Sequence, residues 1–156
     1  MKYDIVGSFL APDDFHTVKS QFEANLIPLS ALTAAEDATV RRIVDRQLEA
    51  GLKEVTSGEV RRKYWDRDFY FHLQGVTRER VESGRVYQDE EAFTDVIRFT
   101  DRIAYNPLHP VFDDFKQLKE YTGSRALCRQ TLPSPTNMLL DILDLSEGHP
   151  ERIYPS

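Results

Sequence analysis

A glutamate and two arginines are placed where they could recognise a small charged molecule. The stretch at 56–62 reads Thr-Ser-Gly-Glu-Val-Arg-Arg and follows a short apolar segment that is typical of a strand. The carboxylate of Glu59 could bind an amino group, and Arg61 or Arg62 could orient it. In a barrel, the carboxyl end of a strand lies at the face that carries the active site. The alternative is a solvated helix start, where a glutamate interacts favourably with the helix dipole.

A glycine and a serine follow another apolar segment near the N-terminus, in the run Val6-Gly7-Ser8-Phe9. Glycine at the end of a strand lets the backbone approach a ligand closely. The serine hydroxyl and the exposed amides could then bind a carboxylate. An ordinary turn with no ligand is the alternative.

Two further stretches could line a pocket. Residues 64–69 mix aromatic rings with acids, which suits a flat heterocycle such as a pterin: a ring stacks on it and an acid bonds its edge. A core-facing aromatic stripe on a helix is the alternative. Residues 131–136 read Thr-Leu-Pro-Ser-Pro-Thr, a stiff turn whose hydroxyls could face a ligand or could merely cap a helix.

Metal and nucleophile motifs are absent from the sequence. The four histidines, His16, His72, His109 and His149, form no HxxxH or HExxH spacing, and none is next to Cys128. We expect Cys128 to be a small core residue in a strand. No P-loop, GxSxG or GxGxxG pattern is present either. We therefore assign no metal ligand and no catalytic residue to the chain.

The hydrophobic pattern predicts strands alternating with helices, which indicates an α/β protein with parallel strands. In the 33–51 helix, Thr33 and Glu36 fit a capping box and Gly51 suits the C-terminal end. A β-hairpin is predicted at 77–88 around Ser83-Gly84. The strands are predicted at 3–9, 52–56, 93–105 and 125–131, the helices at 12–25, 33–51, 60–73, 110–121 and 136–145, and a linker at 146–156. The alternation in 93–105 is imperfect, so a helix is the alternative there.

Composition limits the classes of function. The chain has 156 residues, a formal net charge of -6 and a pI of about 5.2. An acidic balance argues against nucleic acid and against an anionic membrane surface. It does not exclude a small anionic ligand, because local arginines can outweigh the global charge, and the partner we expect is a small-molecule substrate. One cysteine excludes a disulfide within the chain. With no apolar segment long enough to span a bilayer, we predict a cytoplasmic protein.

Taken in order, the motifs resemble the short-form, cobalamin-independent methionine synthase-like family. The resemblance covers nearly the whole chain and matches the N-terminal part of the catalytic barrel. Each motif is modest, but the ordered set is fairly specific. The matching pieces are Val6-Gly7-Ser8-Phe9-Leu10, Gln47-Leu48-Glu49-Ala50-Gly51-Leu52, the stretch at 56–62, Trp65 with Asp68-Phe69, and Leu132-Pro133-Ser134-Pro135-Thr136.

The resemblance implies a fold and a reaction. The fold is a (β/α)8 TIM barrel, of which residues 1–156 would form a single domain: the N-terminal half, with three to four βα units and a β-hairpin insertion. The reaction is methyl transfer from 5-methyltetrahydrofolate to the thiol of homocysteine, which zinc holds as a thiolate. The homocysteine-binding residues would be Val6, Gly7, Ser8 and Glu59, and the folate side would carry Trp65, Asp68, Ser134 and Thr136.

Two departures qualify this resemblance. Ser57 stands where the family has Asp before Gly-Glu, which puts the local geometry or the ligand preference in doubt. The family's zinc ligands, a His, two Cys and an acid, come from the second half of the barrel, beyond Ser156. We therefore expect a truncated chain without the zinc-ligand half, and whether it is an enzyme alone stays open.

A half-barrel would leave a strand edge unpaired and an apolar face uncovered. A homodimer, or association with another chain, would cover both. The alternative function is a non-catalytic half-barrel that serves binding or dimerisation. A third possibility is a uroporphyrinogen decarboxylase-like relative on the same kind of barrel, but the Gly-Glu-Val-Arg-Arg and Pro-Ser-Pro-Thr pieces favour the methionine synthase side.

Overall fold

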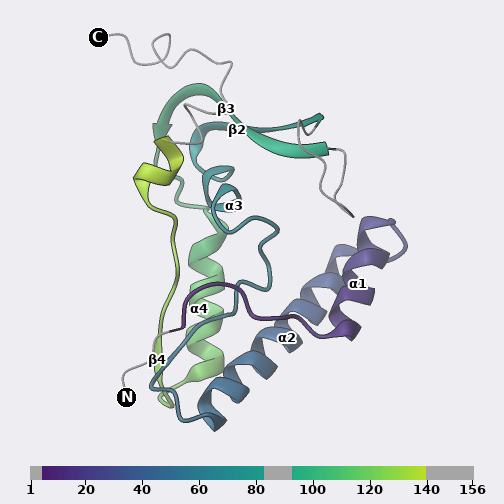
Figure 1. Ribbon diagram of the computed structural model, residues 1–156, viewed down its shortest axis with the longest axis vertical. Helices are drawn as coiled ribbons and strands as arrows, with labels where there is room; N and C mark the ends of the chain where they lie inside the picture. The colour runs from purple at the N-terminus through teal and green to yellow at the C-terminus, as the bar shows by residue number, and fades with distance from the viewer. Residues whose placement is uncertain (1–4, 83–92, 140–156) are drawn as a thin grey trace. The chain divides into compact units, whose positions relative to one another are not determined.

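The computed structural model describes residues 5–82 and 93–139 of the chain. Residue contacts divide the chain into two compact units. Unit 1 comprises residues 1–63 and 112–131, and unit 2 comprises residues 64–111 and 132–156. The architecture is mixed α/β, as predicted, and Figure 1 shows its elements. That the whole chain forms a single domain stays a prediction.

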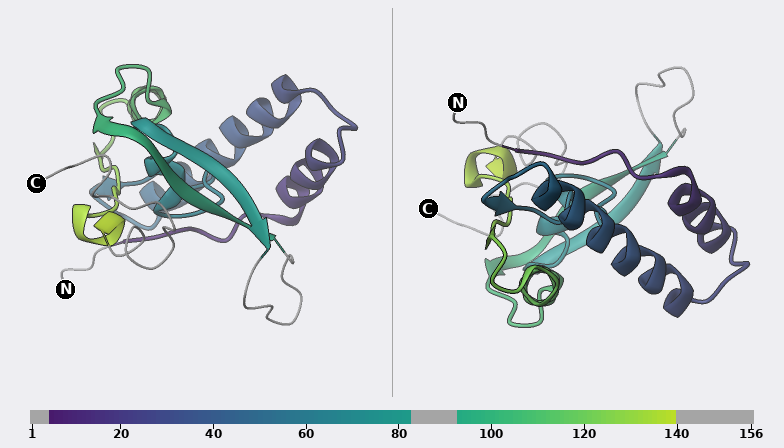
Figure 2. Two further views of the ribbon diagram at one scale, coloured as in Figure 1. Left: turned by 90° about the horizontal axis from the view of Figure 1, so that it is seen from above. Right: turned by 90° about the horizontal axis from the view of Figure 1, so that it is seen from below.

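Helices α1 (Asp13–Glu23) and α2 (Leu29–Glu49) pack against each other in unit 1 (Figures 1 and 2). Helix α1 lies where the sequence predicts it. Helix α2 begins four residues before the predicted capping box, so that Thr33 does not cap it. Pro28 precedes the helix instead, and its carbonyl accepts a hydrogen bond from Ala31 N at 3.0 Å. Proline has no N–H to satisfy and a φ close to the helical value, so a helix starts readily next to it.

Both helices end on a residue with a left-handed backbone. Gly51 has φ +81°, and Leu52 N donates to the carbonyl of Gln47 at 3.1 Å, which closes the last turn of α2. Asn25 takes the equivalent position after α1, with φ +57°. The predicted end of the second helix at Gly51 is therefore confirmed.

The sheet of unit 1 has two parallel strands, β1 (Glu54–Val55) and β4 (Leu127–Cys128). Glu54 pairs with Leu127 and Val55 with Cys128, so the carboxyl ends of both strands meet at one edge. The predicted parallel arrangement is confirmed for this pair. Helix α4 (Pro110–Thr122) precedes β4 and ends before Gly123, as the sequence predicts.

The predicted N-terminal strand at 3–9 is wrong for its described part, because residues 5–9 form no strand. Residues 1–4 lie outside the described ranges. Isolated hydrogen bonds, rather than a strand ladder, join this segment to the rest of unit 1. Phe9 N donates to the carbonyl of Gly58 at 3.1 Å, and Arg129 donates through Nη2 to the carbonyl of Ile5.

The core of unit 1 lies between the helices and the two strands. Burial of these apolar side chains stabilises the unit by roughly 1.5–3 kcal/mol for each large one. The buried apolar residues of this cluster are Phe15, Val40, Ile43, Val44, Val55, Val60 and Leu118. Cys128 is half-buried against this cluster, as expected of a small core residue.

Unit 2 contains a long antiparallel ribbon of β2 (Gln74–Glu82) and β3 (Phe93–Ala104), which twists along its length (Figure 2). The first arm of the predicted hairpin, residues 77–82, is therefore a strand, but it pairs with residues 93–98 of β3. The predicted second arm at 85–88 lies outside the described residues. The predicted turn at Ser83-Gly84 lies outside the described residues. An irregularity at Gly75 breaks the register, and a Cβ added there would clash with the carbonyl oxygen of Arg102.

The predicted helix at 60–73 is wrong, because its only helical part is the short α3 (Arg67–Tyr70). Side chains here bond to nearby backbone groups and compete with helix formation. Asp68 accepts a hydrogen bond from Tyr64 N at 3.0 Å, and Asp66 caps α3 by accepting from Arg67 N at 2.7 Å. Tyr70, Val76 and Ile97 form the buried centre of this unit.

Helical backbone returns at 135–139, at the start of the helix predicted for 136–145. The remainder of that helix and the predicted linker at 146–156 lie outside the described residues. Within the described ranges, no helix is both long and apolar enough to cross a membrane.

Candidate functional site

The carboxylate of Glu59 is the centre of a polar cluster in unit 1. Glu59 follows β1 by a tight turn in which Gly58 has φ +67° and Glu59 itself has φ +56°. A left-handed backbone is uncommon for a residue other than glycine and often marks a functional turn. The side chain is only 6% exposed, so the carboxylate is largely removed from water.

Three side chains bond to this carboxylate. Ser8 donates through Oγ to Oε2 at 2.9 Å, and Thr131 donates through Oγ1 to Oε1 at 2.6 Å. Arg62 donates through Nη1 to Oε1 at 3.2 Å, and its side chain is 14% exposed. Charge-assisted bonds of this kind offset the cost of burying a carboxylate. The segments that end β1 and β4 therefore meet the N-terminal segment at a single acid.

The cluster leaves one acceptor position of the acid open. A carboxylate oxygen has two lone pairs that can accept hydrogen bonds. Oε1 uses both, for Thr131 and Arg62, whereas Oε2 accepts only from Ser8 among the described residues. The remaining lone pair of Oε2 lies beside a hydroxyl oxygen that can also accept. The arrangement suits a ligand group with several N–H donors and a positive charge.

The side chain of Gln47 in α2 fixes the turn that carries Glu59. Gln47 is only 2% exposed. Gln47 donates through Nε2 to the carbonyls of Ile43 at 3.2 Å and Thr56 at 2.8 Å, and its Oε1 accepts from Thr56 N at 3.0 Å. Thr56 Oγ1 in turn accepts from Gly58 N at 3.2 Å. A single buried amide therefore satisfies the backbone at the end of β1 and holds the turn against the helix.

Sequence reasoning found part of this cluster. Ser8 and Glu59 were predicted as site residues, and the structure brings them together. Val6 and Gly7 adjoin Ser8, and Gly7 has φ +92°. Thr131 belongs to the 131–136 turn that could face a ligand but has no individual role in the prediction, and Gln47 appears there only in a matching piece. The end of the strand before Thr131 was a usable signal, because carboxyl ends of neighbouring parallel strands share an edge.

Known proteins resemble this chain. The chain is 34% identical over 136 residues to the uncharacterized protein YxjG of Bacillus subtilis, and 32% identical over 136 residues to YxjH of that organism. A solved structure of a candidate vitamin-B12-independent methionine synthase from Listeria monocytogenes matches 92% of this chain, with a TM-score of 0.72 and 30% identity. The resemblance to the cobalamin-independent methionine synthase-like family is confirmed. No model of a known protein family matches the chain.

A more distant structure shares the fold of this chain. The B12-independent methionine synthase from Shewanella sp. W3-18-1, solved with selenomethionine, has a TM-score of 0.54 and 22% identity over 73% of this chain. The chain spans 35% of the length of each Bacillus relative, 42% of the Listeria chain and 32% of the Shewanella chain. The activities of those whole proteins are therefore only proposals for this one.

The four residues predicted for the folate side belong to unit 2. Trp65 is 55% exposed, and Asp68 is engaged by the backbone of Tyr64. Ser134 accepts through Oγ from Asn137 N at 3.2 Å, which is the capping role considered from the sequence. Thr136 is exposed. The folate role of these four residues stays a prediction.

The described residues do not fit the zinc that the resemblance implies. Among them, no group of three or more His, Cys, Asp or Glu side chains lies close enough to hold a metal ion. Cys128 Sγ faces the carbonyl of Leu118 at 3.7 Å and packs in the core. We therefore derive no step of a reaction through zinc from these residues.

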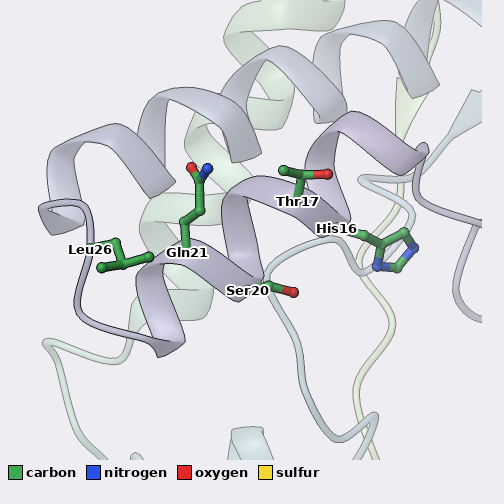
Figure 3. A pocket seen from close by; sticks show the side chains of 5 residues that line it. All are labelled: His16, Thr17, Ser20, Gln21 and Leu26. Atoms are coloured by element: carbon green, nitrogen blue, oxygen red, sulfur yellow. The ribbon is translucent and has the colours of Figure 1, made fainter.

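Two surface hollows belong to unit 1 and share no lining residue with the Glu59 cluster. The first, of about 460 Å³, is lined by side chains of α1 and the residue Leu26 that follows it (Figure 3). Its lining consists of His16, Thr17, Ser20, Gln21 and Leu26. The second, of about 340 Å³, is lined by Arg41, Val44, Asp45, Tyr121 and Arg125.

Arg61 lies in an acidic cluster of its own rather than at Glu59. Its guanidinium pairs with Asp37, with Glu36 at 3.5 Å and with Asp114 at 3.4 Å, and donates to Gln117 at 2.8 Å. Burial raises the pKa of Glu36 above its ordinary value of 4.5 and the pKa of Asp114 above 3.8, and the charge of Arg61 opposes both shifts. The two adjacent arginines therefore serve different acids.

This cluster gives a testable dependence of stability on pH. An acid whose pKa is higher in the folded chain binds more protons there, so the free energy of unfolding falls as the pH rises between the unfolded and folded pKa values. For Glu36 that interval begins at 4.5. The variant Glu36→Gln cannot titrate, so its urea midpoint should fall less than that of the wild type from this pH towards neutrality. Glu23→Gln, at an exposed acid, is the matched control; equal slopes for Glu36→Gln and the wild type would contradict the prediction.

Proposed function

We propose that the Glu59 cluster binds the amino group of homocysteine in a methionine synthase-like methyltransferase. The supporting observation is the open acceptor on a largely buried carboxylate, next to the hydroxyl oxygen of Ser8. An amino acid carries an ammonium group with three donors and a positive charge at neutral pH. The ammonium would bond to Glu59 Oε2 and to Ser8 Oγ.

The contacts refine the role that the resemblance gives to the N-terminal segment. Ser8 Oγ already donates its hydrogen to Glu59, so its hydroxyl cannot also donate to the substrate carboxylate. Backbone N–H groups of the Val6-Gly7-Ser8 segment are the remaining candidates for that carboxylate. A Cβ added at Gly7 would meet no atom within 4 Å, so there is open space on that side of the backbone.

We extend the proposal to the barrel fold and to the methyl donor. We place β1 and β4 in a (β/α)8 barrel, on the strength of the likeness to the Listeria structure. Trp65, Asp68, Ser134 and Thr136 are proposed to face 5-methyltetrahydrofolate, the methyl donor of the family. This chain's residues bind and orient the substrate, whereas thiol activation is not assigned to any of them.

Binding of two ligands by the full 156-residue chain tests the proposal. Isothermal titration compares homocysteine with 4-mercaptobutanoate, which has the same thiol and carboxylate but no amino group. A charge-assisted hydrogen bond contributes about 1.5–3 kcal/mol, so homocysteine should bind roughly 10- to 100-fold more tightly. Equal affinity for the two ligands, or binding of neither, would refute the assignment of Glu59 to the amino group.

A further inference from the structure

We propose that Thr131 and Arg62 are positioning residues that direct the open acceptor of Glu59 towards the amino group of the substrate. The inference rests on the proposed function and adds to it a determinant of ligand selectivity. Neither residue needs to touch the ligand. Their effect is exerted through the orientation of one carboxylate.

The two residues are bonded both to Glu59 and to each other. Thr131 Oγ1 donates to Glu59 Oε1 at 2.6 Å, and Arg62 Nη1 donates to the same oxygen at 3.2 Å. Arg62 also donates through Nη2 to the carbonyl of Thr131 at 2.5 Å. The arginine thereby joins the segment after β1 to the segment after β4, and both segments hold a single carboxylate oxygen.

These bonds give the two oxygens of the acid different tasks. A terminal carboxylate torsion has a broad, two-fold energy profile, so a free acid would exchange its oxygens readily. With two donors on Oε1, rotation would break both bonds at once. Oε2 is therefore kept beside Ser8 with its remaining lone pair open. The β-branched side chain of Thr131 also has few rotamers, which favours a fixed position for its hydroxyl.

The test uses three variants of the full chain and the same two ligands. Thr131→Val keeps the shape but removes the hydroxyl, and homocysteine affinity should fall about tenfold while 4-mercaptobutanoate affinity stays unchanged. Thr131→Ser restores the hydroxyl and should recover most of the affinity. Thr122→Val is the matched control, because the buried Thr122 hydroxyl has no hydrogen-bond partner among the described residues.

If the substitution only disturbed the structure, the affinities for both ligands would fall by the same factor. That result would overturn the inference. No change in Thr131→Val, or no recovery in Thr131→Ser, would overturn it too. If Thr131→Val does not fold, Arg62→Lys replaces it, since lysine cannot hold Glu59 and Thr131 with separate nitrogens. The same selective loss of homocysteine binding is then expected. Failure of the proposed function is recognised separately, because the wild type would then show no preference for homocysteine.

Discussion

Replacement of Glu59 by glutamine is expected to lower the affinity for homocysteine roughly 10- to 100-fold, the value of one charge-assisted bond. The amide keeps the shape of the acid, and its oxygen can still accept from Thr131 and Arg62. Its NH2 group, however, takes the place of Oε2 and presents donors to an ammonium group. Glutamine at φ +56° is no more strained than glutamate, so the turn should persist. Calorimetric titration with homocysteine measures the effect.

The matched control is Glu49→Gln, which makes the same chemical change at an exposed acid at the end of α2. Its affinity for homocysteine should equal that of the wild type. Circular dichroism of both variants checks that the helices persist. A Glu59→Gln chain that binds homocysteine as tightly as the wild type would remove Glu59 from the site.

Replacement of Gln47 by leucine is expected to lower the free energy of unfolding of unit 1 by roughly 2–4 kcal/mol. Leucine has a similar volume but cannot bond to the backbone of Thr56, whose N–H and carbonyl would both lose their side-chain partner. Each buried polar group without a partner costs about 1–3 kcal/mol. The loss falls on the turn that carries Glu59, so homocysteine binding should weaken as well.

Two measurements distinguish this local effect from a general one. Urea unfolding followed by far-ultraviolet circular dichroism reports on the helices, and amide hydrogen exchange reports on Thr56 N directly. Gln21→Leu, at an exposed glutamine of α1, should change the stability by less than about 0.5 kcal/mol. Unaltered exchange at Thr56 in the Gln47→Leu chain would show that the amide bridge does not protect the turn.

Local sequence signals predicted those parts of the fold that depend on local chemistry. Helix α1 and the glycine at the end of α2 lie where periodicity and turn residues place them. For 93–105 the β-branched and aromatic residues favoured the strand that the structure has, although its imperfect alternation left a helix open. The helix predicted at 60–73 is wrong because the spacing of its aromatic residues resembles a helical stripe. Its backbone is instead bonded by Asp66 and Asp68, which no periodicity reveals.

In the candidate site, too, the local sequence predicts some features, whereas others depend on tertiary contacts. Glu59 and Ser8 were found because an acid or a hydroxyl after an apolar segment is visible in the sequence. The role of Thr131 depends on which strand ends meet, which is a property of the pairing of β1 with β4. The bond between Ser8 and Glu59 depends on how the N-terminal segment is held against the turn after β1, as by the bond of Phe9 N to the carbonyl of Gly58. Arg61 and Arg62 are adjacent and chemically alike, and only the packing of α2 and α4 assigns the first to Asp37 and Asp114.

The carboxylate of Glu59 joins residues separated by 51 and 72 positions along the chain. Contacts of such separation have a high cost in loop-closure entropy and need most of the unit to be ordered. The Glu59 cluster therefore has no counterpart in the unfolded chain, and a ligand that engages it binds only the folded form. Homocysteine would in that case act as a folding ligand for unit 1, raising its unfolding midpoint with concentration. Recognition and folding would thus be one linked equilibrium in this protein.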